Sequence, residues 1–127
     1  MATYKKESNM HRFCLECREE IFNPLCPICL AGEIKVWMRN KPQIVKRGIK
    51  EELNKILVFA KFNDYPSCVV CTKNKVFMCP YCFTERIYNN LKQARIQKKI
   101  LMDFLEAFNF DFEHNGYSKD MEKFGML

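Results

Sequence analysis

Apolar residues recur at helical spacing in two long stretches of the chain. Between residues 85 and 108 they follow steps of three, four and seven, with basic residues on the opposite side. In the other stretch they are Val45, Ile49, Leu53, Ile56, Leu57 and Ala60. The spacing therefore predicts a helix over about residues 43–62, weakened locally by Gly48, and a long amphipathic helix over about residues 85–108.

A shorter stretch, residues 33–39, alternates instead between apolar and other side chains. Its two sides are Ile34, Val36 and Met38 on one and Lys35, Trp37 and Arg39 on the other. Because successive side chains of a strand point to opposite faces, this alternation predicts a half-buried strand. It would lie directly before the helix over residues 43–62.

The cysteines add a chemical pattern, since all eight fall in Cys-x-x-Cys pairs with none left over. The pairs are Cys14/Cys17, Cys26/Cys29, Cys68/Cys71 and Cys79/Cys82. Such a pair points two sulfurs at one ion about 2.3 Å away, and two pairs complete a tetrahedral shell. The sequence therefore predicts two closed zinc sites, with two zinc ions per chain that contribute to folding. Iron is chemically possible with the same ligands.

The spacing leaves open which pairs share an ion. Sequential pairing closes loops of eight and seven residues, whereas crossed or nested pairing must bridge the 38 residues between Cys29 and Cys68. Loop entropy favours the sequential arrangement by about 1–2 kcal/mol. The expected organisation is one compact unit of 127 residues. Its parts are a first finger (13–32), a basic strand–helix spacer (33–66), a second finger with its long helix (67–108) and a tail (109–127).

Both cysteine clusters resemble known zinc fingers. The spacing within residues 13–29 is similar to that of the four-cysteine finger of RecR-type recombination mediators. In the second cluster, Lys73-Asn74-Lys75 is a turn signal between two short strands and Thr84 is a candidate helix cap. That order is similar to a treble-clef finger. Many such knuckles carry glycine after the second cysteine, whereas the residues here are Arg18, Leu30, Thr72 and Phe83.

These patterns together predict an α+β fold, in which the fingers would resemble the zinc-ribbon or treble-clef type. It would hold two small four-cysteine zinc fingers with short hairpins, a connecting basic helix and a long C-terminal amphipathic helix. Four thiolates close the coordination shell and leave no open position for water, so a catalytic zinc is not expected.

An enzymatic alternative rests on Cys79-Pro-Tyr-Cys82, which resembles the active-site tetrapeptide of glutaredoxins. That resemblance implies thiol–disulfide exchange by a thiol activated at a helix N-terminus. No proline follows Pro80, so the cis-proline that completes a thioredoxin-like site is missing. A redox site also needs one pair, whereas this chain has four. Thiol–disulfide oxidoreductase is therefore the minor alternative.

The formal net charge of +6 is concentrated between the cysteine clusters, where residues 34–62 hold eight basic and two acidic side chains. Such a segment suits phosphate backbones or an acidic protein. The candidate nucleic-acid contacts are Lys35, Trp37, Arg39, Lys46, Arg47 and Lys50. The indole of Trp37, between two cations, could stack on a base, or it could cover a neighbouring helix.

The sequence thus predicts a non-enzymatic zinc-binding protein that acts as a nucleic-acid-binding or regulatory factor. The alternative is a zinc-stabilised adaptor that binds a protein through the apolar stripe of residues 85–108, which could also form a dimer seam. No stretch approaches the roughly 20 apolar residues that span a bilayer, and the first ten residues are polar. A cytoplasmic protein without a membrane partner is expected.

Overall fold

The computed structural model describes residues 13–21, 24–62 and 64–108, and the predicted tail (109–127) lies outside these ranges. Its elements are α2 (Pro27–Trp37), η1 (Met38–Asn40), α3 (Gln43–Ile56), η2 (Leu57–Lys61), α4 (Pro80–Gln93) and α5 (Lys98–Ala107). Within the described ranges no strand forms, and Phe13 and Glu20 make only an isolated antiparallel bridge. The predicted α+β class with hairpin fingers is therefore wrong, and the fold is helical.

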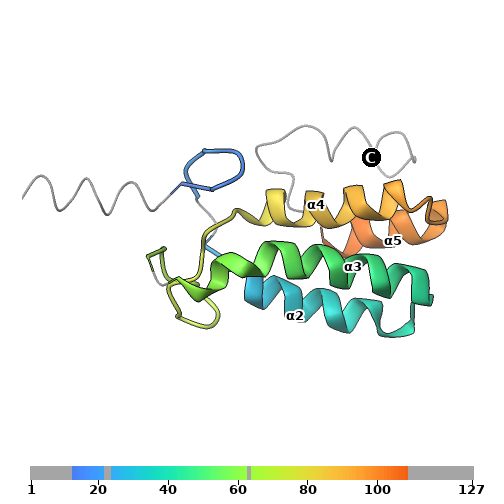
Figure 1. The fold of residues 1–127 in the computed structure, drawn as a ribbon, viewed down its shortest axis with the longest axis horizontal. Helices are drawn as coiled ribbons and strands as arrows, with labels where there is room; N and C mark the ends of the chain where they lie inside the picture. The colour runs from blue at the N-terminus through green and yellow to red at the C-terminus, as the bar shows by residue number, and fades with distance from the viewer. Residues whose placement is uncertain (1–12, 22–23, 63, 109–127) are drawn as a thin grey trace, which may run out of the picture.

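The helices form two antiparallel hairpins that pack side by side (Figure 1). α2 and α4 both begin at the end of the molecule where the cysteine-bearing loops lie, and α3 and α5 run back toward that end. α3 packs against α4 in the middle of the array. The starts of two helices therefore meet at one end of the body.

The predicted strand over residues 33–39 is wrong, because these residues belong to α2 and η1. The helix begins earlier, at Pro27, whose ring presets a helical φ angle in the first turn, after Cys26 in extended conformation. The side chains buried along α2 and η1 are Pro27, Leu30, Ala31, Ile34 and Met38. Val36, which the alternation placed on the buried side, is 56% exposed. The spacing of the buried side chains is therefore that of a helix and not of a strand.

The helix predicted over residues 43–62 is confirmed as α3, continued by the 3-10 helix η2. Its buried residues are Val45, Ile49, Leu53 and Ile56, spaced by three and four as the sequence indicated. Gly48 lies where α3 approaches α4, and a Cβ there would stand 2.5 Å from Oδ1 of Asn90. The missing side chain permits this close approach.

The single helix predicted over residues 85–108 is divided into α4 and α5. Shortly after the end of α4, Arg95 adopts the left-handed conformation with φ 56°. The N–H of Ile96 donates to the carbonyl of Leu91, and that of Arg95 donates to the carbonyl of Lys92. This is a Schellman ending, and Ile96 and Leu91 are both buried in the core. No glycine marks this break between α4 and α5 in the sequence.

The start of α4 also differs from the predicted one. Cys79, not Thr84, is the N-cap residue, and Pro80 occupies the first turn. Thr84 is fully buried within the helix, where its hydroxyl donates to the carbonyl of Pro80 at 2.8 Å. A Cys-Pro-x-Cys sequence therefore begins both α2 and α4.

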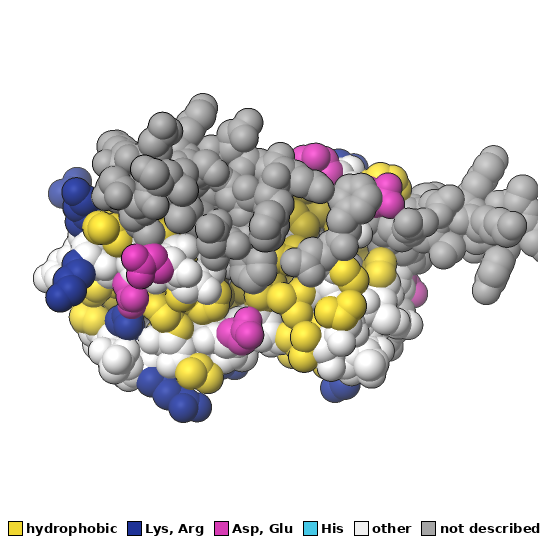
Figure 2. Space-filling view, turned by 180° about the vertical axis from the view of Figure 1, so that it is seen from behind, with side chains coloured by type: hydrophobic (Ala, Val, Ile, Leu, Met, Phe, Trp, Pro, Cys, Tyr) yellow, Lys and Arg dark blue, Asp and Glu magenta, His cyan; other side chains and the backbone are white. Residues whose placement is uncertain are grey.

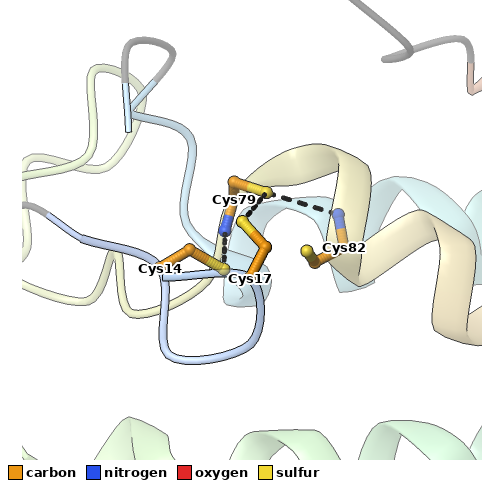
Figure 3. A group of neighbouring side chains, drawn as sticks. All are labelled: Cys14, Cys17, Cys79 and Cys82. Atoms are coloured by element: carbon orange, nitrogen blue, oxygen red, sulfur yellow. Dashed lines mark hydrogen bonds between the residues drawn. The ribbon is translucent and has the colours of Figure 1, made fainter. Parts of the chain in front are cut away.

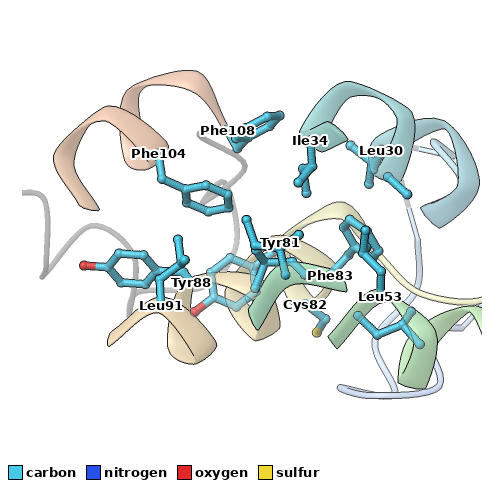
Figure 4. Close-up of a cluster of buried hydrophobic side chains, with 14 of the residues drawn as sticks. Leu30, Ile34, Leu53, Tyr81, Cys82, Phe83, Tyr88, Leu91, Phe104 and Phe108 are labelled. Atoms are coloured by element: carbon cyan, nitrogen blue, oxygen red, sulfur yellow. The ribbon is translucent and has the colours of Figure 1, made fainter. Parts of the chain in front are cut away.

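One main core joins the four helices (Figure 4). The side chains that converge in it include Leu30 and Ile34 of α2, Leu53 of α3, Phe83 and Leu91 of α4, and Phe104 of α5. The apolar stripe of residues 85–108 is thus already occupied by contacts within the chain. Among the described helices, none combines the length and hydropathy that crossing a membrane requires.

Candidate metal centre

The eight cysteines come together in two groups of four at the shared end of the hairpins. Site 1 consists of Cys14, Cys17, Cys79 and Cys82, and site 2 consists of Cys26, Cys29, Cys68 and Cys71. The outer two pairs of the sequence share one site and the inner two share the other. The sequential pairing favoured by loop entropy is therefore wrong, and the pairing is nested.

The sulfur positions fit a tetrahedral ion. Within each site the four sulfurs lie within 4.8 Å of one another. The Sγ atoms of Cys17 and Cys79 are 4.0 Å apart, those of Cys26 and Cys71 3.7 Å, and those of Cys68 and Cys29 3.8 Å. Four sulfurs placed tetrahedrally at 2.3 Å from zinc are about 3.8 Å apart, whereas disulfide-bonded sulfurs are about 2.05 Å apart. Each group could hold one metal ion.

Each site takes one of its pairs from a tight turn. In these turns the residue after the second cysteine adopts the left-handed conformation, with φ 66° at Arg18 and 63° at Thr72. The N–H of each donates to the carbonyl of the first cysteine of its turn, Cys14 or Cys68, at 2.9 Å. These are the positions where glycine is common in zinc knuckles, so the turn geometry is present without the glycine.

The other pair of each site lies at the start of a helix. In site 1, Cys79 precedes α4 and Cys82 lies in its first turn, facing Cys14 and Cys17 on the loop (Figure 3). The backbone N–H of Cys79 points to Sγ of Cys14 at 3.3 Å. The corresponding N–H of Cys26 points to Sγ of Cys68 at 3.4 Å. Helix N-termini favour negative charge and so stabilise thiolates.

The two halves of the chain have the same order of parts: a cysteine turn, a Cys-Pro-x-Cys helix start and a helical hairpin. Each site combines the turn of one half with the helix start of the other. The repeated Cys-Pro-x-Cys could have shown from sequence that the halves are alike. The repeat does not indicate that the cysteine turn of each half joins the helix start of the other half.

Four neighbouring thiols cannot all ionise without a cation among them. In site 1, hydrogen bonds with Cys79 and Cys82 lower the pKa of Cys14, and the contact with Cys14 raises the pKa of Cys79 to about 12. In site 2, burial raises the pKa of Cys29. Burial also acts on Cys68, but backbone N–H groups outweigh it and lower its pKa to about 6. A divalent cation would remove this conflict, which fits the all-thiolate donor set.

The surroundings of the two sites differ. Cys14 and Cys82 of site 1 belong to the main core, with Cys17 and Cys79 packed against it. Site 2 lies in a separate small cluster built around Cys26, Cys68 and Val76, with Ile21, Leu25, Cys29 and Cys71 packed against them. Site 1 is thus part of the body, and site 2 is attached to it.

Trp37, the candidate base-stacking residue, packs against α5. Its indole N–H donates to a carboxylate oxygen of Asp103 at 3.1 Å, and its ring meets Phe104 edge-on at 5.3 Å between centroids. The ammonium of Lys41 lies 4.5 Å from the ring centroid. The structure therefore uses Trp37 to join the two hairpins.

The candidate basic residues remain at the surface. Lys35 on α2 and Arg39 on η1 are exposed. On α3, Arg47 and Lys50 are exposed and Lys46 is half-buried; these three form a basic strip within about one turn of the helix. Seen from behind, hydrophobic side chains gather toward the cysteine end, whereas Lys and Arg are most numerous at the opposite end and along the lower edge (Figure 2).

Comparison of this chain with known protein families, with curated proteins and with solved structures finds no match.

Proposed function

We propose that this chain is a non-enzymatic protein in which two structural zinc ions hold a helical body together, and that the body binds nucleic acid. The observation that carries the zinc proposal is the pair of four-sulfur groups with tetrahedral spacing. Cys17 and Cys79, which are 62 positions apart in the sequence, meet in site 1. An ion bound there cross-links distant segments and so adds folding free energy.

The contacts of Cys79 and Cys82 support a ligand role for them over a redox role. Cys17 lies 4.0 Å from Cys79 between sulfurs, and the N–H of Cys79 is directed at Cys14. A resolving pair that reacts with an outside disulfide needs one accessible thiolate. Here Cys82 is buried, and contact with Cys14 raises the pKa of the half-buried Cys79 to about 12, so it is a poor thiolate; both thiols are part of a four-sulfur group.

The nucleic-acid proposal rests on local charge. Eight thiolates and two divalent ions together carry four negative charges, so zinc binding lowers the formal net charge from +6 to +2. The overall charge is then a weak attractant for a polyanion. The basic strip (Lys46, Arg47 and Lys50) lies on α3, whose N-terminal half is remote from the cysteine end, and it keeps its positive potential there.

The first experiment measures metal content and its removal. Elemental analysis of freshly purified protein is expected to find two zinc ions per chain, with all eight thiols reduced. A strong chelator is expected to abolish the helical circular dichroism signal, because the ions supply much of the folding free energy. A metal-free chain that unfolds cooperatively from a fully helical state would overturn the structural role.

A second experiment tests the basic strip. Affinity for a nucleic acid is expected to fall steeply between about 50 and 200 mM salt, and the triple variant Lys46→Gln/Arg47→Gln/Lys50→Gln is expected to flatten that slope. A matched control removes the same charge from the other hairpin through Lys92→Gln/Lys98→Gln/Lys99→Gln. Equal effects of both triples, or no binding at all, would reject the basic strip as the interface and leave a protein-interaction role.

A further inference from the structure

Sites 1 and 2 have the same internal construction but different attachments to the fold. In both, a turn with a left-handed residue meets a Cys-Pro-x-Cys helix start. The difference lies outside the sulfurs, because two ligands of site 1 belong to the main core and none of site 2 does. The consequences of losing an ion should therefore differ between the sites.

α2 keeps its place in the body without site 2. Leu30 and Ile34 are fully buried in the main core, and Met38 of η1 is also buried there. At the far end of α2, Trp37 donates to Asp103 and packs on Phe104 of α5. These contacts hold the helix against its neighbours without help from Cys26 or Cys29, since burial of apolar surface is the main favourable contribution to folding.

The turn of site 2 depends on its ion more strongly. Val69 and Val70 at its tip are 67% and 65% exposed, so they contribute little burial. The N–H of Val69 donates to the carbonyl of Pro24 and so ties the turn to the first half of the chain, whereas the N–H of Val76 donates to the carbonyl of Pro66 within the same loop. Sulfur contacts with α2 and its N-cap supply a further anchor.

Site 1 is attached in the opposite way. Cys82 lies on α4, the helix that contacts α2, α3 and α5. The turn of Cys14 is tied to the segment before α4 by the N–H of Leu15, which donates to the carbonyl of the fully buried Phe77. Arg86 of α4 pairs with Glu16 of the same turn. An ion lost from site 1 would open the main core.

We propose that site 2 is an exchangeable zinc site, whose ion can leave and return while the helical body stays folded, whereas the ion of site 1 leaves only when the body unfolds. This rests on the zinc binding proposed above. Its consequence is that zinc occupancy controls the order of the turn that presents Val69 and Val70. On release, Zn²⁺ passes to an acceptor ligand such as a chelator and the freed thiolates take up protons from water; rebinding reverses both steps, with no change of oxidation state.

Stepwise chelation of the unaltered protein tests this. A zinc indicator and far-ultraviolet circular dichroism are recorded together. One ion per chain is expected to leave with the helical signal retained, and the second with loss of that signal. Hydrogen exchange after the first step should accelerate over residues 64–76 while α4 stays protected. Release of both ions in one step, or unfolding on the first release, would refute the proposal. A protein that binds no zinc would instead refute the proposed function.

Two matched double variants show which site releases its ion in each step of the chelation. Cys68→Ser/Cys71→Ser removes the turn ligands of site 2, and Cys14→Ser/Cys17→Ser removes the equivalent ligands of site 1. The first variant is expected to hold one zinc ion and unfold cooperatively. The second is expected to lose the helical signal. If both fold equally well with one ion each, or if the first fails to fold, site 2 is not the exchangeable one.

Discussion

At the scale of single residues, the cysteine turns use left-handed backbone at side chains that disfavour it. Thr72, at φ 63°, is β-branched, which makes this conformation costly. Thr72→Gly is expected to stabilise the zinc-bound protein by about 1 kcal/mol, because glycine adopts positive φ freely. Urea unfolding with zinc in excess measures the change. Thr72→Ala serves as the control, since alanine keeps most of the penalty, and an equal gain from alanine would contradict the explanation.

Gly48 and Asn90 form a second residue-scale test. A Cβ at Gly48 would meet Oδ1 of Asn90, a buried atom with no hydrogen-bond partner among the described residues. Gly48→Ala should gain about 1 kcal/mol of helix propensity, but only where the neighbouring oxygen is absent. We therefore expect the full gain in an Asn90→Ala background and a smaller gain, or a loss, in the natural background. Urea unfolding of the four proteins measures the coupling, and additive effects would show that the contact is harmless.

At the scale of elements, Arg86 joins α4 to α3 and to the turn of site 1. Its guanidinium lies 2.8 Å from a carboxylate oxygen of Glu52, whose side chain is only 12% exposed, and 3.6 Å from Glu16, which is 48% exposed. Glu52→Gln is expected to cost about 1–2 kcal/mol, because a partly buried pair is screened less than a surface one. Glu16→Gln is expected to cost under about 0.5 kcal/mol. Thermal unfolding compares the two, and equal losses would refute this ranking.

The elements also show what the sequence could predict. α3 was predictable because every buried residue follows the helical period and its outer face is polar except for the exposed Ile44. Residues 33–39 were wrongly predicted as a strand because Val36 completes an apolar–polar alternation, although its side chain is exposed to solvent. The division between α4 and α5 was hidden because an arginine, Arg95, occupies the left-handed position that usually carries glycine. The two helix starts had a readable signal in Pro27 and Pro80, each one residue after a cysteine.

At the scale of the whole molecule, the grouping of the cysteines into pairs was predictable and the choice of which pairs share a site was not. Pair spacing is local, whereas sharing depends on which helix starts lie beside which turns. Loop closure favoured sequential sites by only about 1–2 kcal/mol. Packing α2 beside α4, with both helices starting at the same end, outweighs that difference because it places each helix start beside the turn from the other half. The packing of the helical core, and not loop entropy, therefore determines which cysteine pairs share a site.

The nested pairing can be tested in the intact chain with two variants that each replace four cysteines by serine. Replacing Cys26, Cys29, Cys68 and Cys71 removes site 2 alone, so one zinc ion and the helical signal are expected to remain. Replacing Cys68, Cys71, Cys79 and Cys82 leaves the first four cysteines of the sequence intact but takes two ligands from each site. That variant is expected to lose the helical body.

Cobalt substitution reports tetrahedral thiolate ligation in these variants, and circular dichroism reports the fold. The two proteins lose the same number of thiols, so a difference between them comes from which ligands remain together and not from how many remain. A helical second variant with one tetrahedral cobalt ion would instead require sequential sites, because its remaining ligands all come from one half of the chain.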